Sequence, residues 1–522
     1  MLWEHEVAGS NPVAPTSDLK LTGLRGGSHD VVQGMAAGTS RVPGYRSDEE
    51  VSSVASRRQD CKGHRTFRET PLSDAVDLPA LPLRKVEGLP GEGGKHQVRD
   101  SLEQLRDMHG FLQTRRERFG PNFAHGYFGF VELAVGEPEL VREILLDRGA
   151  DFSSRMGWDF SIGELFEGGL MLRDFDDHRA QRNIMQAAFR PGAMRGYLEI
   201  INPIIHRTLT QWGRSPSFRF FPAIKRLGLQ VATELLLGES LDARTGRKIG
   251  RSFVDAVNAA VAVVRRPVPP GRYWRGMRGR AFLERYFASQ IEERRRSTRT
   301  DMLSQLCRAE DEAGDRLSDE EIAQHMIFLV LAAHDTTASA ITTAVWALGE
   351  HPHWQERLRK EIRAHESAAM QYDACDALVE TDWVFKEALR LQPPGSFMMR
   401  RTVREVQLGP YTLPKNLSVS PASRITHYLP DWWTDPTRFD PSRFSPERAE
   451  HKRHPGLYYP FGGGAHMCLG VHLATMQAKA FLYQFLRRYT VIPRSRRPTH
   501  FQPVPIPHPT NSLPIGLVHA VA

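Results

Sequence analysis

The sequence predicts a mainly α-helical protein with small β-sheets, and three stretches carry that prediction. Residues 469–489 form an apolar run without Pro, and without Gly after Gly470, as a long helix requires. Residues 318–349 begin with the capping box Ser-Asp-Glu-Glu, end at a Gly and are mostly apolar, which predicts a helix crossing the protein interior. Residues 400–420, by contrast, alternate like short strands, with turns at Gly409-Pro410 and Pro414-Lys-Asn.

The composition is that of a large globular protein. Of 522 residues, 40% are hydrophobic and 25% are charged, so the chain can bury a large core. The 69 Lys and Arg exceed the 61 Asp and Glu, giving a formal net charge of +8, which suits an acidic protein partner. No nucleic-acid-binding motif accompanies this charge, so no nucleic-acid partner is expected.

Cysteine usage and apolar run lengths indicate the compartment. The four Cys form no C-x-x-C pair, which argues against a disulfide framework or a zinc site and for a reducing compartment. No run reaches the ~18 apolar residues that span a bilayer. We therefore expect a cytoplasmic protein without a transmembrane anchor. The cysteines are Cys61, Cys307, Cys375 and Cys468.

The beginning of the chain differs from the rest. Residues 1–80 are rich in Gly, Ser and charge and lack sustained periodicity, which is typical of disorder or of an upstream-extended translation. They also lack the regions of a signal peptide. We expect residues 81–522 to form a single catalytic domain, and removal of the segment before Leu78 to leave that domain intact.

The first elements of this domain alternate between helix and strand. Residues 100–119 are helical in pattern, 123–135 are aromatic-rich and strand-like, and 138–148 form a short amphipathic helix. Residues 152–171 contain four Gly and are expected to lack regular structure. The next helix carries His178 and Arg182, which share a face at i,i+4 and are either a surface pair or an anion-binding fork.

Two further helices are expected at residues 222–237 and 251–264. The run Arg265-Arg-Pro-Val-Pro-Pro-Gly271 then breaks the chain, and a basic helix follows to about Arg296. Its basic and aromatic composition is that of a solvated arginine face or of a membrane-surface contact.

The long interior helix contains unusual chemistry for a core element. Asp335 and Thr336 stand in its middle, in Ala-Ala-His-Asp-Thr-Thr, where a carboxylate and a hydroxyl lower stability unless they are paired. They are either a satisfied acid with a helix-bending Thr, or a functional acid–alcohol pair.

The glycine-rich turn that runs from Phe461 to Gly470 is the strongest candidate site. Its glycines let a planar group or another backbone approach closely. Cys468 follows them near a helix N-terminus, which favours a thiolate. A thiolate with cleared space around it is what an axial haem ligand needs, although a lone Cys is also commonly a small core residue.

This turn resembles the haem-binding signature of the cytochrome P450 family, F-x-x-G-x-(R/H)-x-C-x-G. The matching residues are Phe461, Gly464, His466, Cys468 and Gly470. Residues 332–337 resemble the family's (A/G)-G-x-(D/E)-T pattern, with Ala333 where Gly is commonest. Glu387, Arg390 and Arg443 resemble its structural triad, with Ser442 in place of a more frequent acidic residue. The resemblance extends over about residues 80–520.

The resemblance implies the cytochrome P450 fold, with haem b between the long central helix and the Cys468 loop. Cys468 would be the iron ligand, and Asp335 and Thr336 would relay protons toward the oxygen site. The haem propionates would be neutralised by His178, Arg182, Arg400 and His466, with Arg401 as a rival to Arg400. The triad would be structural.

The implied activity is that of a soluble, bacterial-type monooxygenase. It would use O2 and electrons from NAD(P)H, delivered by a ferredoxin or flavodoxin and its reductase. The enzyme is expected to be a monomer with a basic docking face. A haem-thiolate peroxygenase or isomerase and a non-enzymatic haem protein are the alternatives. Apolar pocket candidates predict a lipid-, terpenoid- or sterol-like substrate: Met156, Trp158, Phe160, Leu165, Phe397 and Met398. The docking face is expected near Arg179, Lys479, Arg487 and Arg488.

Overall fold

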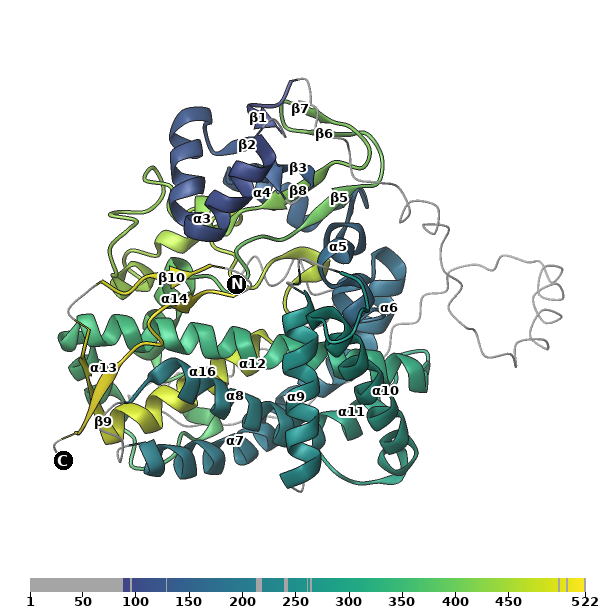
Figure 1. Ribbon diagram of the computed structural model, residues 1–522. Coiled ribbons are helices and arrows are strands. Elements are labelled where there is room, and N and C mark those ends of the chain that lie inside the picture. Colours follow the sequence, from purple (N-terminus) through teal and green to yellow (C-terminus); the bar gives the residue numbers. More distant parts are fainter. Residues whose placement is uncertain are drawn as a thin grey trace, which may run out of the picture. The chain divides into compact units, whose positions relative to one another are not determined.

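The long capped helix predicted from residue 318 is α12, Asp319–Glu350, in a computed structural model of the chain (Figure 1). The Ser318 hydroxyl accepts the Glu321 N–H, and the Glu321 carboxylate accepts the Ser318 N–H, so the capping box is confirmed. The structure describes residues 88–93, 96–127, 129–212, 218–238, 243–260, 262, 265–495, 498–503 and 506–520. Residues 1–80, for which the sequence predicts disorder, lie outside this range.

Helix α12 is the core element around which the other helices pack. In Figure 1 it crosses the middle of the picture, with α7, α8 and α16 below it, and it contacts α8, α10, α14 and α16. Of the described helices it is the one long and apolar enough to cross a membrane, but 67% of its apolar window is buried inside the protein. Its length and apolar composition are therefore explained by its place in the interior of a large α-rich domain.

Together with α12, the remaining α-helices account for most of the described chain. They are α3 (Gln97–Phe119), α4 (Pro138–Leu146), α5 (Ser154–Phe166), α6 (Phe175–Met185), α7 (Pro191–Trp212), α8 (Phe220–Leu237), α9 (Ala243–Ala260), α10 (Arg272–Arg296), α11 (Met302–Arg308), α13 (Pro352–Arg363), α14 (Val379–Leu391), α15 (Ser423–Thr426) and α16 (Val471–Arg488).

The described strands form one six-stranded sheet and three two-stranded ones. The large sheet has the order β1-β2-β3-β8-β5-β4, with β2 and β3 joined as an antiparallel hairpin. Residues Leu140 and Ile144 of α4 share a hydrophobic cluster with Leu133 and Val419 of this sheet. The large sheet is built from β1 (Gly91–Gly93), β2 (Asn122–Tyr127), β3 (Phe130–Val135), β4 (Phe152–Ser153), β5 (Arg400–Thr402) and β8 (Ser418–Pro421).

The small sheets follow the predicted turns. Strands β6 (Val406–Leu408) and β7 (Tyr411–Leu413) pair around Gly409, whose positive φ of 53° suits the predicted turn. Strands β10 (Phe501–Gln502) and β11 (His508–Pro509) form an antiparallel pair late in the chain, and Ser339 of α12 donates a hydrogen bond to the carbonyl of Pro507. Strands β9 (Tyr489–Pro493) and β12 (Ile515–His519) make up the third pair.

The prediction that residues 152–171 lack regular structure is wrong, because they contain α5. The Ser153 hydroxyl and the Asp174 carboxylate accept N–H groups at the first turn and thereby start the helix. A Cβ at Gly157 would lie 2.7 Å from the Arg400 nitrogen, so this glycine lets α5 pack against β5 rather than breaking the helix. Helix α9 begins eight residues before residue 251, where the sequence pattern predicts its start. Helices α7, α11 and α13 are present although the sequence pattern predicts no helix there.

Candidate active site

The Cys468 loop is a tightly built turn before α16. Gly462 and Gly464 have positive φ values of 73° and 61°, and a Cβ at Gly464 would lie 1.8 Å from the carbonyl oxygen of Leu145 in α4. The Cys468 N–H donates to the Phe461 carbonyl at 2.8 Å, which closes the loop. The glycines are therefore needed both for the backbone conformation and for close packing on α4.

The Cys468 sulfur lies in a loop crowded by protein, yet its side chain is exposed. Burial raises the pKa of the thiol, and the Gly470 N–H donor and Arg182 only partly oppose this. Helix α16 begins three residues later, at Val471, and desolvation is the largest influence on the pKa of the free thiol. An accessible thiol in such surroundings is not an ordinary core cysteine, and it is available to a ligand.

Four predicted site residues gather beside this loop. The rings of His178 and His466 lie 3.9 Å apart between centroids, and Arg182 and Arg400 both lower the pKa of each ring by their charge. Burial is the larger cause and brings the pKa of His178 to about 3. Without an anion beside them both imidazoles are therefore neutral, and each can donate one N–H; their role toward the propionates stays a prediction.

The cluster carries unmatched positive charge. Burial lowers the pKa of Arg182, while Cys468 raises it, and Arg182 makes no ion pair with a carboxylate of the described residues. His178 Nδ1 is buried and has no partner among them either. A buried cation and an orphaned polar atom in one place are the donors that an anionic group requires.

Arg400 rather than Arg401 belongs to this cluster. Burial lowers the pKa of Arg400 despite the nearby carboxylates of Asp174 and Asp147, and its charge acts on His466. A guanidinium nitrogen of Arg401 instead lies 3.4 Å from Asn416 Oδ1. The carboxylate whose charge acts on Arg401 is that of Asp159. Adjacent residues of a strand point to opposite faces, which explains the difference.

Asp174 is a member of the site that the sequence did not reveal. Its carboxylate accepts the Ser154 N–H at 2.7 Å and lies 3.9 Å from His466 Nε2. The signal in the sequence was an acid directly before the helix that carries His178. The Asp174 carboxylate thereby connects the start of α5 with the Cys468 loop.

Asp335 and Thr336 point in different directions from α12. Thr336 is half-buried and donates to the Ala332 carbonyl at 2.6 Å, whereas Asp335 is buried and lies 2.7 Å from Lys225 Nζ of α8. His334 Nε2 is 3.1 Å from the same Asp335 oxygen. Burial would raise the pKa of Asp335, but His334 and Lys225 outweigh it and lower the pKa to about 2.

Neither Lys225 nor His334 was singled out from the sequence. The available signal was a lone lysine inside the apolar-periodic stretch that forms α8. Close approach of the two helices makes the contact possible, because Gly228 presents no side chain to the His334 carbonyl, which would lie 3.3 Å from a Cβ there.

One stripe of α12 stays accessible although the helix is in the core. Phe328, Ala332 and Thr336 recur at four-residue spacing, and all are half-buried. Leu331 and Ala333 border them and are also half-buried. The stripe is apolar except for Thr336, so it is a lipophilic surface with one hydroxyl.

The Glu387, Arg390 and Arg443 triad is confirmed as a buried contact. Glu387 accepts two hydrogen bonds from Arg390, at 2.7 and 2.8 Å, and lies 3.1 Å from Arg443 Nε. All three side chains are fully buried. Glu450, which the sequence did not reveal, takes the other side of Arg443 at 2.9 Å. The triad braces the segment before the Cys468 loop.

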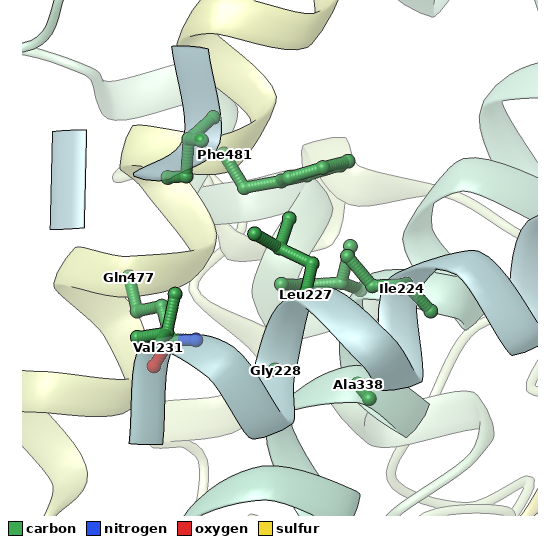
Figure 2. Close-up of a pocket in the computed structure, with 9 residues that line it drawn as sticks. Ile224, Leu227, Gly228, Val231, Ala338, Gln477 and Phe481 are labelled. Atoms are coloured by element: carbon green, nitrogen blue, oxygen red, sulfur yellow. The ribbon is translucent and has the colours of Figure 1, made fainter. Parts of the chain in front are cut away.

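A separate apolar pocket lies between α7, α8, α12 and α16, and none of the predicted site residues lines it. Figure 2 shows Leu227 and Ile224 of α8 pointing toward Phe481 of α16, with Gln477 at one edge. Its lining residues lie within the helix layer and do not include Cys468.

The predicted docking face is only partly present at the surface. Lys479 is buried and lies 3.2 Å from Asp382, and Arg487 donates to the carbonyls of Ile362 and His365. The burial of Lys479 removes it from a docking face, whereas Arg487 is half-buried and its place in such a face stays a prediction. Arg179 remains 72% exposed beside Asp176.

The residues present fit a haem. The Gly-cleared loop supplies an accessible thiol, Arg182 and His178 supply unmatched donors for propionates, and the α12 stripe is apolar. No group of three or more His, Cys, Asp or Glu in the described residues could hold a bare metal ion. The α-rich fold and this loop together define the haem-thiolate class of protein.

The comparisons identify the family within that class. The cytochrome P450 family model matches residues 93–514. The chain is 36% identical over 451 residues to cytochrome P450 136 of Mycobacterium tuberculosis, which covers 84% of this chain and 92% of that protein. It is 30% identical over 453 residues to cytochrome P450 26B1 of Homo sapiens, with 83% and 86% covered. The chain belongs to the cytochrome P450 family.

The solved structures agree with this assignment. The structure described as retinoic acid bound cyanobacterial CYP120A1 matches with a TM-score of 0.75 and 26% identity, covering 84% of this chain and all of that one. Members of the family are monooxygenases that use haem b, O2 and electrons from NAD(P)H through redox partners. The predicted fold and class of enzyme are therefore confirmed.

Proposed function

We propose that this enzyme inserts one oxygen atom into a long, apolar substrate, with Cys468 as the iron ligand. The observation that carries the proposal is an accessible thiol in a glycine-cleared loop beside an unmatched arginine, Arg182. The haem, when bound, supplies the activation of O2 and its insertion into the substrate. The protein supplies binding, orientation and protons.

The cation cluster, which consists of Arg182, Arg400, His178 and His466 beside the Cys468 loop, is proposed to hold the haem propionates. Arg182 and Arg400 would provide charge, and the neutral rings of His178 and His466 would each donate one N–H. Phe461, half-buried against the main core cluster, would form part of the wall behind the loop. Gly464 and Gly470 would keep the loop close to α4 and to the sulfur.

A proton route is proposed along α12. Lys225 is 39% exposed, whereas Asp335 is 10% exposed, so the lysine is the member of this proton route nearest to water. Asp335 would pass protons inward from that ion pair, and the Thr336 hydroxyl would hold them at the accessible stripe.

Apolar surface supports a lipophilic substrate. The stripe of α12 is lined by Phe328, Leu331 and Ala332, and Trp158 and Phe160 of α5 pack against a cluster that contains Phe397. The related solved structure is described as retinoic acid bound. We therefore propose a lipid-, terpenoid- or sterol-like molecule, with retinoic acid as the first probe.

The remaining parts of the proposal concern context. Electrons would come from NAD(P)H through a reductase and a ferredoxin or flavodoxin, to a cytoplasmic monomer. Residues 81–522 would be the catalytic domain, so a chain beginning at Leu78 should keep its haem content and thermal unfolding. A loss of either would contradict this domain assignment.

The substrate is tested by titrating the purified haem protein and following the Soret band. Retinoic acid, a fatty acid and a sterol should convert low-spin to high-spin iron, and a sugar of similar size should not. Product carrying one oxygen atom from O2 should then form with NAD(P)H and a ferredoxin system. A spectral response to the sugar alone, or to none of the apolar probes, would contradict the proposed substrate class.

A further inference from the structure

The pocket between α7, α8, α12 and α16 is surrounded by apolar side chains, and we name it the four-helix pocket (Figure 2). Three of these helices each contribute an isoleucine to its lining, namely Ile205 of α7, Ile224 of α8 and Ile341 of α12. These isoleucines are at most 2% exposed. Among the described residues that line the pocket, only Gln477 of α16 has a polar side chain, and it stands at one edge.

Small residues at the contact of α8 with α12 leave this space open. Gly228 has no side chain and Ala338 has only a methyl group, and a Cβ added at Gly228 would lie 3.9 Å from the Cβ of Ala338. Leu227 of α8 and Phe481 of α16 approach from two sides and do not fill the space (Figure 2). The remaining room is about that of one water-sized molecule.

Water is a poor occupant of the four-helix pocket. A buried water typically makes about three hydrogen bonds. Every lining residue lies inside α7, α8, α12 or α16, so its backbone groups are bonded along a helix. The side-chain amide of Gln477 is the polar group that is left among the described lining residues. Apolar cavities of this kind stay dry and take up small apolar molecules instead.

The position of the pocket indicates which small apolar molecule it would take. Members of the family consume O2, which is apolar and close to water in size. Ala338 and Ile341 lie on the side of α12 opposite to Thr336, because a helix has 3.6 residues per turn. The thickness of one helix, about 10 Å, therefore separates the four-helix pocket from the accessible stripe of α12.

We propose that the four-helix pocket binds O2. The molecule needs no hydrogen bond, and its size suits the space. A substrate of the proposed class is too large for the pocket, and an ion would leave its charge without partners there. The proposal rests on the use of O2 by the family and depends neither on the proposed iron ligand nor on the proposed substrate.

The test measures O2 at isoleucine methyl groups of the full-length haem protein. O2 is paramagnetic, so it speeds the relaxation of nuclei in proportion to the time that it spends beside them. Oxidised haem iron does not bind O2, so the difference between methyl spectra under O2 and under argon reports O2 elsewhere in the protein. The methyls of Ile205, Ile224 and Ile341 should show a several-fold larger effect than those of Ile322 and Ile362, which are fully buried outside the pocket.

A variant that fills the pocket provides the second arm. Val231→Ile adds one methylene at a lining position and should remove most of the O2 effect at Ile224 and Ile341. Val345→Ile is the matched control, because it adds the same group at a fully buried position of α12 outside the pocket. Haem content and thermal unfolding report whether each variant is folded. If Val231→Ile does not fold, Ala338→Val fills the space from α12 with the same expected result.

Three results would overturn the proposal. The first is an equal O2 effect at the pocket isoleucines and at the two reference isoleucines of the wild type. The second is an O2 effect that persists unchanged when the pocket is filled, because O2 would then reside elsewhere. The third is a nuclear Overhauser contact between water and the Ile341 methyl, which would mean that water occupies the pocket.

Discussion

Lys225 Nζ of α8 lies 2.7 Å from Asp335 Oδ1 at the middle of α12. The ammonium and the carboxylate form an ion pair between the two helices. With His334 it keeps the pKa of Asp335 at about 2, below the usual value of 3.8. The stability that this gives is present above pH ~4 and is lost as the pH falls toward 2. The carboxylate is therefore ionised at every working pH and exchanges protons only transiently.

Lys225→Met should slow product formation several-fold, because it removes the member of the proton route that reaches water. Haem content should not change, since Lys225 does not contact the cation cluster. Turnover with a ferredoxin system measures the effect. Arg226→Met is the matched control, because Arg226 is exposed on the neighbouring position of α8. Equal turnover in Lys225→Met and wild type would remove Lys225 from the route.

Thr336→Ala should increase the peroxide released per NAD(P)H consumed. The hydroxyl that holds protons at the accessible stripe is lost, while volume and haem binding change little. Thr342→Ala is the control, because Thr342 makes the same 2.6 Å bond to the carbonyl four residues earlier but is fully buried. A similar rise in peroxide in both variants would mean that helix geometry, and not the Thr336 hydroxyl, controls coupling.

Cys468→Ser should abolish the red-shifted Soret band of the reduced carbonyl complex, since an alcohol does not replace the thiolate donor. Cys307→Ser and Cys375→Ser should keep that band, because Cys307 is buried in the main core cluster and Cys375 packs against that cluster. Absorption spectra of the purified proteins measure this. A retained band in Cys468→Ser would exclude Cys468 as the ligand.

The elements with a continuous local signal were predictable from the sequence. The capping box at Ser318, the Gly409 turn and the run of glycines before Cys468 are each recognisable from nearby residues, and all are present. Helix α5 was missed because its start depends on Asp174, some 20 residues later in the chain. Local patterns do not contain that contact.

The same reason explains the partly predicted site. The motifs named His178, Arg182, Arg400 and His466, and the structure brings them together. The Lys225–Asp335 ion pair joins residues 110 positions apart, and the burial of Lys479 depends on Asp382. Charge and spacing along the chain do not reveal which cations remain free for a partner.

Glu387→Ala should lower the free energy of unfolding by about 3–5 kcal/mol, because it leaves the buried guanidiniums of Arg390 and Arg443 without their shared carboxylate. Chemical denaturation measures this. Glu380→Ala, which breaks a partly exposed pair with Arg357, should cost less than about 1 kcal/mol. Similar losses in both variants would contradict the bracing role of the triad.

Glu132 predicts a pH dependence of stability that is independent of the haem site. It is buried in β3, accepts a hydrogen bond from Ser420 and lies 3.7 Å from His125 Nε2. Burial raises the pKa of Glu132 from 4.5 to about 7, and it lowers the pKa of His125 to about 4. Both groups are therefore neutral in the folded protein near pH 6.

The two shifts act in opposite directions. For Glu132 the folded pKa is raised, so its contribution to stability is complete below pH ~4.5 and is lost as the pH rises through about 7. For His125 the folded pKa is lowered, so its contribution is present above pH ~6.5 and is lost as the pH falls toward about 4. Replacing Glu132 alone separates them.

Glu132→Gln should therefore gain stability relative to wild type between pH 5 and pH 8, by up to about 3 kcal/mol from the shift in the Glu132 pKa. Urea unfolding of both proteins at the two pH values measures the difference. The amide keeps the shape and can still bond Ser420, so little change is expected at pH 5. Glu139→Gln, on the exposed side of α4, is the control and should show no such gain. An unchanged difference between Glu132→Gln and wild type across this range would mean that Glu132 remains ionised in the folded protein.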